Sequence, residues 1–125
     1  MNWIELRELD KEIAIMQGHK LIDNPWELDD RSLEDIAHMR RYLKVKSIHN
    51  GIPMECPFYT SDMADAIHLM EDMAFLNPFL GFTAHHDRIW EYSWYEPGQD
   101  MSRVTASSPS MAVARGWLQW KVSSH

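Results

Sequence analysis

Residues 79–95 read FLGFTAHHDRIWEYSWY, and in this segment apolar and polar residues alternate over the length of two β-strands. The alternation is clearest in the second half, where Trp90, Tyr92 and Trp94 share one face, because neighbouring side chains of a strand point to opposite faces. We therefore expect an antiparallel β-hairpin over 79–95. A two-stranded hairpin is only marginally stable in water, so helices must pack against it.

The rest of the chain supplies helical patterns on both sides of this hairpin. Apolar residues recur at spacings of three and four near 3–17, 61–75 and 109–121, which predicts three amphipathic helices. We expect a further strand at 103–106 and a further helix at 30–43, with acids at its start and bases at its end. These elements predict an α+β fold with a small antiparallel sheet covered by helices.

Local signals mark several element ends. Ser108 followed by Pro109 is the clearest helix start, and a hydroxyl group within 59–62 is expected to cap the helix at 61–75. Short extended pieces are expected at 19–22 and 44–48. Between them and the third helix, two prolines and a glycine in 50–57 exclude a regular helix.

The length of 125 residues predicts a single domain over 1–125. The chain has 19 acidic and 12 basic side chains, for a formal charge of −7, which argues against tight binding to nucleic-acid phosphates. A single cysteine, Cys56, excludes an internal disulfide and fits a reducing cytoplasm. The charged N-terminal segment is not typical of a signal peptide, and no apolar run approaches the ~20 residues that a membrane span needs.

Three short pieces of the chain resemble the phage ABA sandwich domain family. The segment 59–67 reads YTSDMADAI at the head of a helix, and 106–118 reads ASSPSMAVARGWL in the place of the family's final helix. The opening helix is similar through Leu9-Asp10, Ile13-Ala14 and Gly18. The chain departs from the family over about 23–57, which we interpret as an insertion.

The resemblance implies a layered α/β/α arrangement and an origin among small accessory proteins of a bacteriophage or prophage. It carries over no catalytic residue. Ala114 stands where the family has a cysteine, and Gly116 stands where it has an alanine. These two differences leave the expected fold intact and exclude a thiol role in the last helix.

Two groups of residues could in principle hold a metal ion. His85 and His86 are adjacent near the expected hairpin turn, but neighbouring strand residues face opposite sides, so a solvated loop is the favoured interpretation. Asp65, His68 and Glu71 are three residues apart and share a helix ridge, which is also typical of an ordinary hydrated face. We predict no metal and no cofactor.

Nucleophilic catalysis has weaker support still. Cys56 lies between Glu55 and Pro57, and a neighbouring carboxylate raises a thiol pKa where reactivity needs it lowered. Ser107 and Ser108 read as helix-entry residues without a Gly-x-Ser-x-Gly frame, and the chain has no glycine-rich phosphate loop. The sequence therefore predicts no catalytic residue and a protein that is not an enzyme.

The aromatic residues give the better indication of function. Six tryptophans are many for this length, and core packing is the first explanation for Trp90, Trp94 and Trp117. Trp3, Trp26 and Trp120 lie near termini or turns, where burial is harder, and exposed aromatic side chains anchor protein interfaces. The candidate interaction residues, from the insertion and the hairpin, are Trp26, Tyr42, His85, His86, Trp90 and Trp94.

The sequence thus predicts a non-enzymatic accessory protein that binds a host or phage protein in the bacterial cytoplasm, alone or as a homodimer. An inhibitor of bacterial defence, such as an anti-CRISPR protein, is the most specific form of this hypothesis. One alternative is a metal-binding module or metal-dependent enzyme that uses His85 and His86. The other is a nucleic-acid-binding regulator, for which the acidic composition is unfavourable, with a basic cluster of Arg40, Arg41, Lys44 and Lys46.

Overall fold

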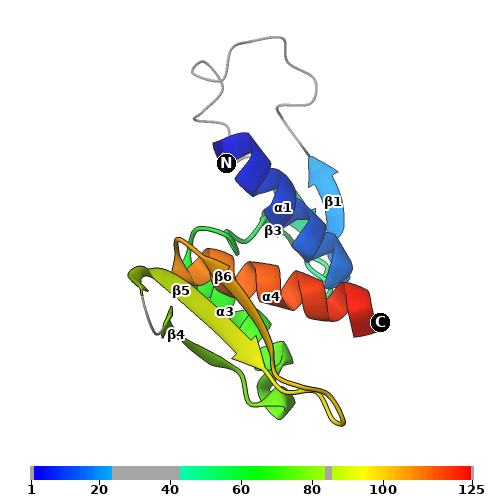
Figure 1. Cartoon of the computed structure of the whole chain (residues 1–125). Coiled ribbons are helices and arrows are strands. Elements are labelled where there is room, and N and C mark those ends of the chain that lie inside the picture. Colours follow the sequence, from blue (N-terminus) through cyan, green and yellow to red (C-terminus); the bar gives the residue numbers. More distant parts are fainter. Residues whose placement is uncertain (1, 24–42, 84–85, 125) are drawn as a thin grey trace. The chain divides into compact units, whose positions relative to one another are not determined.

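The computed structural model describes residues 2–23, 43–83 and 86–124, without the side chains of residues 23, 86, 87 and 124. These residues form three α-helices and two antiparallel sheets of three strands each, which confirms the predicted α+β class (Figure 1). By its internal contacts the chain divides into two compact units, 1–58 and 59–125. The single domain predicted from the chain length stays a prediction. The helix predicted at 30–43 lies, apart from its last residue, outside the described residues.

The first unit combines one helix with one small sheet. It contains α1 (Trp3–Met16), β1 (Lys20–Asp23), β2 (Lys44–Lys46) and β3 (Pro53–Glu55), and the sheet order is β1-β2-β3. The helix and the first two strands lie where the sequence places them. The strand β3 is not predicted, because prolines discourage a strand; Pro53 is tolerated at the first position of an edge strand, where its missing N–H group costs no ladder bond.

Arg7 ties α1 to the segment that ends the first unit. Its guanidinium group donates to Asp10 Oδ2 at 2.8 Å and to the carbonyl oxygens of Cys56 and Pro57 at 2.9 and 3.1 Å. The group also lies 3.7 Å from the ring centroid of Phe58. Because Arg7 and Asp10 are both buried, these contacts satisfy charges that water does not reach.

The second unit holds the predicted hairpin. Its elements are α3 (Met63–Asp72), η2 (Ala74–Leu76), β4 (Phe79–Thr83), β5 (His86–Trp94), β6 (Ser102–Ala106) and α4 (Pro109–Ser124). The sheet order is β4-β5-β6, with Phe82 opposite Trp90 and Tyr92 opposite Val104. The hairpin over 79–95 and the strand near 103–106 are therefore confirmed.

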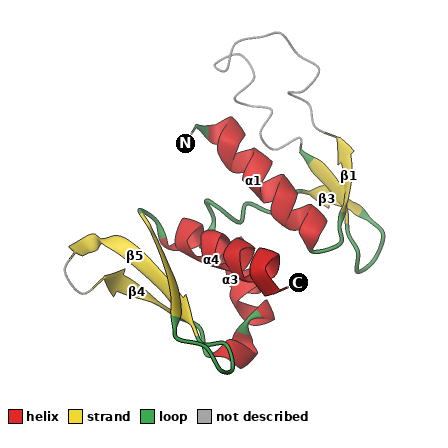
Figure 2. Ribbon diagram, turned by 45° about the vertical axis from the view of Figure 1, so that its right-hand side comes forward, coloured by secondary structure: helices red, strands yellow, loops and turns green. Residues whose placement is uncertain are grey.

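The helix α4 packs on one face of the sheet, and α3 packs against α4 (Figure 2). Tyr92 is buried on that face, and a Cβ atom on Gly116 of α4 would lie 2.3 Å from Tyr92 Cδ2. The hydroxyl group of Tyr92 donates to Met73 Sδ, directly after α3, at 3.3 Å. Trp117 Nε1 of α4 donates to Asp72 Oδ2 of α3 at 3.2 Å. The glycine lets α4 approach the sheet closely, and Tyr92 reaches past it to the end of α3.

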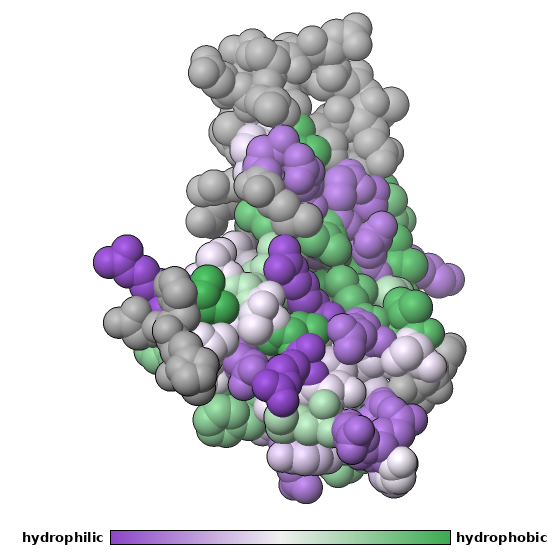
Figure 3. All heavy atoms as spheres, in the orientation of Figure 1, coloured by the Kyte–Doolittle hydropathy of each residue, from purple (hydrophilic) through white to green (hydrophobic). Residues whose placement is uncertain are grey.

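The opposite face of this sheet carries exposed side chains, among them Phe79, Arg103 and Thr105. Hydrophilic and hydrophobic side chains are mixed over the face of the molecule drawn in Figure 3. The predicted cover of this sheet by the helix near 3–17 stays a prediction, because α1 belongs to the other unit.

One predicted helix start is confirmed and one is wrong. Ser108 Oγ accepts the backbone N–H of Met111 at 3.2 Å, and α4 begins at Pro109 as expected. The cap of α3 is Asp62 rather than a hydroxyl group, and its side chain accepts the Ala64 N–H at 2.9 Å. An aspartate is as good a cap as serine, so residue type alone does not distinguish adjacent positions in this segment.

Candidate functional site

The six predicted interaction residues differ in whether the structure describes them and in how exposed they are. Trp26, Tyr42 and His85 lie outside the described residues, and His86 opens β5 with its side chain outside them. Trp90 is partly exposed, as an interface residue must be. Trp94 is only 1% exposed, so its selection as a surface residue is wrong and its expected role in the core is right.

Among the described residues three tryptophans, Trp94, Trp117 and Trp120, are buried because of where their elements pack. Trp94 shares the face of Tyr92 against α4, and among the described residues its Nε1 has no hydrogen-bond partner. Trp120 is only 6% exposed although it lies near the C-terminus, which corrects the expectation that it resists burial. Its ring is in edge contact with Phe75 and lies near the Lys121 ammonium group, so the last turns of α4 belong to the packed part of the unit.

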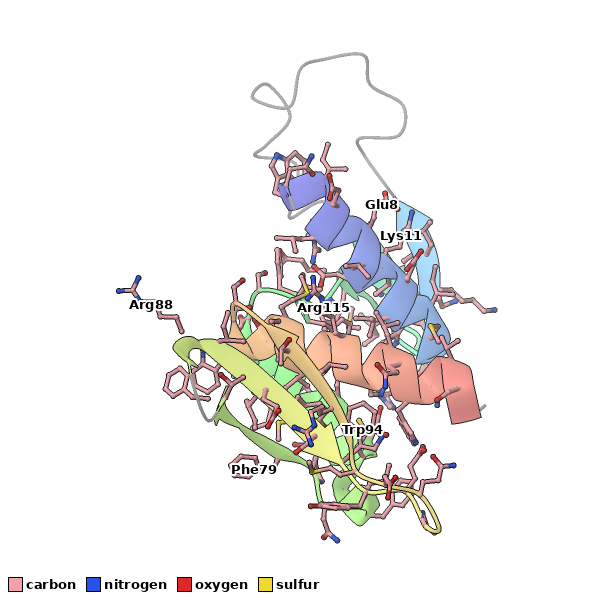
Figure 4. The ribbon with its side chains drawn as sticks, viewed as in Figure 1. Glu8, Lys11, Phe79, Arg88, Trp94 and Arg115 are labelled. Atoms are coloured by element: carbon pink, nitrogen blue, oxygen red, sulfur yellow. The ribbon has the colours of Figure 1, made fainter. Side chains whose placement is uncertain are left out.

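Exposed aromatic rings gather on β4. Phe79 and Phe82 are 62% and 53% exposed, and the Phe79 ring lies over Gly81 of the same strand, where an added Cβ atom would be 2.9 Å from its Cε1 (Figure 4). The rings of Phe82 and Trp90 stack in a tilted arrangement with centroids 4.3 Å apart. We call Phe79, Phe82 and Trp90 the β4 aromatic surface. Phe79 and Phe82 lie on opposite faces of the strand, so this surface flanks its edge on both sides.

The strand β4 is an edge of its sheet and carries no charged residue, since it reads FLGFT. The other edge strand, β6, carries a charged side chain. Arg103 of β6 pairs with Glu91 at 3.7 Å, and Arg115 of α4 donates to the Thr105 carbonyl oxygen at 3.2 Å. Charged side chains on an edge strand oppose pairing with another chain, and an uncharged apolar edge permits it. The two edges of one sheet therefore differ in their capacity to accept a further strand.

Phe79 and Phe82 are not among the interaction residues predicted from the sequence. The alternating pattern places both on a strand, but it does not say which strand is the edge, and β6 pairs with β5 rather than with β4. A run of five strand residues without a charge, next to a proline, is the signal that could have indicated them.

The predicted helix ridge is hydrated. His68 Nδ1 and Glu71 Oε2 are 3.5 Å apart, and both side chains are largely exposed, which agrees with the favoured interpretation. Within the described ranges no group of three or more His, Cys, Asp or Glu residues could hold a metal ion. The metal alternative built on His85 and His86 concerns residues whose side chains the structure does not describe.

Cys56 is fully buried, so a dissolved substrate does not reach its thiol. Its backbone serves the first unit, because its N–H donates to the Leu43 carbonyl oxygen at 2.8 Å and its own carbonyl accepts from Arg7. In the second unit, burial raises the pKa of Tyr92, which keeps its hydroxyl group protonated. Both side chains are placed for packing.

Two described histidines of the first unit, His19 and His49, lie close together. His19, directly before β1, is 7% exposed, and its Nδ1 accepts the backbone N–H of Ile48 at 3.0 Å. The ring of His49 lies edge-on to it, with centroids 5.9 Å apart. Burial and the neighbouring His49 lower the pKa of His19 below its usual value.

Comparison of the chain with protein-family models, with curated proteins and with solved structures finds no match. The resemblance to the phage ABA sandwich domain family accordingly stays a prediction. Among the helices that the structure describes, none is both long and apolar enough to cross a lipid bilayer.

Proposed function

We propose that this chain is a non-enzymatic accessory protein of a bacteriophage or prophage, and that it binds a host or phage protein. An inhibitor of bacterial defence, of which an anti-CRISPR protein is one form, is the most specific version of the proposal. The observation that carries the binding part is the β4 aromatic surface on an uncharged sheet edge.

Two features of this surface suit it to protein binding. Aromatic side chains contribute strongly at interfaces because they bury much apolar area at a small cost in conformational entropy. Phe82 and Trp90 already stack on each other, so part of that ordering is complete before a partner arrives.

The edge position suggests how the partner is held. An extended segment can add to β4 as a fourth strand, with backbone hydrogen bonds along the edge and apolar side chains beside Phe79 and Phe82. The −7 charge of the chain favours a partner with basic residues around this apolar centre.

The proposal is tested by capture from infected host cells with the tagged full-length protein, followed by mass spectrometry. Three baits are compared: the unmodified chain, Phe82→Ser, and Phe75→Ser. Phe75 is a matched control, because it is 71% exposed in the same unit but lies on η2 rather than on β4. A partner that uses β4 is retained by Phe75→Ser and lost by Phe82→Ser.

Titration of the purified partner then gives the size of the effect. We expect Phe82→Ser to weaken binding at least ~tenfold, the loss typical of a central aromatic contact. If Phe82→Ser binds the partner as tightly as the unmodified chain does, β4 is not part of the interface. Turnover of a substrate by the purified chain would instead contradict the non-enzymatic part of the proposal.

A further inference from the structure

The connection between α1 and β1 is joined to the β2–β3 turn at two points. His19 Nδ1 accepts the N–H of Ile48, the first residue of that turn. One residue earlier, Gly18 adopts φ +99°, and a Cβ atom there would lie 2.4 Å from Ile48 Cδ1. The side chain of Ile48 therefore packs directly over the glycine, while its backbone is held by the histidine.

The hydrogen bond fixes the protonation state of the His19 ring. The Ile48 N–H group can only donate, so Nδ1 must be unprotonated and the ring must carry its single proton on Nε2. A second proton would sit on Nδ1 and face the N–H donor. Protonation would therefore replace the acceptor at Nδ1 with an N–H group that repels the Ile48 N–H group. Little water could compensate for this loss, because His19 is only 7% exposed.

Among the residues that the structure describes, the surroundings of His19 add little that would stabilise an imidazolium ion. His49 faces it from the β2–β3 turn. On the strands, Lys20 follows it on β1 and pairs with Lys46 of β2, so the nearest strand charges are positive. The last residues of α1, 13–16, are uncharged. The two acids of this sheet, Asp23 and Glu55, both lie opposite Lys44, at the other end of β2.

We propose that His19 is a pH-sensitive latch, which closes the β2–β3 turn onto the α1–β1 connection when neutral and releases it when protonated. The turn carries two exposed isoleucines, Ile48 and Ile52, so release frees a loop with two apolar side chains at this end of the first unit. The remaining turn bonds, such as Ser47 N–H to the Ile52 carbonyl oxygen at 3.1 Å, do not involve the imidazole and keep the turn itself folded.

The direction of the pH effect follows from linkage. The pKa of folded His19 lies below the usual value of 6.5, so the unfolded chain binds this proton more readily than the folded one. The stabilising contribution is complete above pH 6.5 and decreases as the pH falls from there to the lowered pKa. Acid thus opens the latch.

Nuclear magnetic resonance of the full-length protein tests the latch. At pH 7.5 we expect the ring nitrogens of His19 to show the Nε2–H tautomer. Between pH 7.5 and 5.0 the protection factor of the Ile48 amide against hydrogen exchange should fall about three- to tenfold, the range that one hydrogen bond supplies. Amides of α4, in the other unit, serve as the internal reference.

Two variants make the test specific. His19→Asn offers an acceptor oxygen at the Nδ1 position and does not titrate, so its Ile48 protection should stay constant over this range. His68→Gln removes an exposed histidine and should keep the full pH response. A pH response that persists in His19→Asn overturns the proposal. So does a His19 ring with its proton on Nδ1 at pH 7.5, which is read from the unmodified protein even if the variant does not fold.

Discussion

Arg7 and Lys11 form two ion pairs of the same spacing on α1, and the pairs differ in exposure. Arg7 and Asp10 are buried, whereas the side chains of Lys11 and Glu8 are partly exposed (Figure 4). We expect Arg7→Met to lower the free energy of unfolding by about 3–5 kcal/mol, because it leaves the Asp10 carboxylate buried without the arginine. Lys11→Met should cost less than ~1 kcal/mol. Urea unfolding followed by circular dichroism measures both.

The double variant Arg7→Met/Asp10→Leu separates charge from packing. If the loss of stability comes from removing the arginine charge beside the buried Asp10 carboxylate, removal of that carboxylate should restore a large part of the stability. If the double variant is as unstable as Arg7→Met, the loss comes instead from the carbonyl oxygens of Cys56 and Pro57, which both variants leave without this donor.

At the scale of the element, Gly116 governs how closely α4 lies on its sheet. Alanine is normally favoured over glycine inside a helix by ~1 kcal/mol, but its Cβ atom would lie 2.3 Å from Tyr92 Cδ2. We expect Gly116→Ala to reduce the free energy of unfolding by about 1–3 kcal/mol, since overpacking outweighs propensity. Gln119→Ala on the exposed side of α4 should change it by less than ~0.5 kcal/mol. A stabilised Gly116→Ala variant would mean that the helix and sheet are further apart.

The elements that sequence reasoning predicts correctly are those with local causes. The hairpin follows from the alternation along Trp90, Tyr92 and Trp94, and α4 begins at Pro109 because the cap and the proline are adjacent in the chain. The burial of Trp120 is different, because it depends on contact with the distant Phe75, and no local pattern encodes it. The strand β3 pairs with β2 across a short turn, and it is missed because prolines discourage a strand.

The candidate surface also combines features that local sequence patterns predict with features that depend on packing and sheet order. Trp90 is predicted as an interface residue and is partly exposed, whereas Trp94, with the same strand face and residue type, is buried. The difference comes from α4, which packs directly on Trp94. A Cβ atom added to Gly116 of α4 would lie 3.1 Å from Trp94 Cζ3. Phe79 and Phe82 become candidates only when the sheet order makes β4 an edge.

At the scale of the whole molecule, net charge and the β4 edge act against each other. The charge of −7 at pH 7 separates copies of the chain, and this repulsion vanishes near the isoelectric point of about 5.4. An uncharged apolar edge is then free to pair with the same edge of another copy. We expect self-association to rise as the pH falls from 7.5 to 5.4, as measured by light scattering.

A charge placed on the edge distinguishes strand pairing from a general loss of repulsion. Phe82→Lys and Phe75→Lys change the net charge by the same amount, but only the first places an ammonium group on β4. Self-association at pH 5.4 should therefore decrease much more in Phe82→Lys, because lysine on an edge strand disfavours pairing in any register. If the two variants self-associate to the same extent at pH 5.4, net charge alone accounts for the association. The uncharged edge would then be left as a surface for a different partner, since a strand that binds another protein need not bind itself.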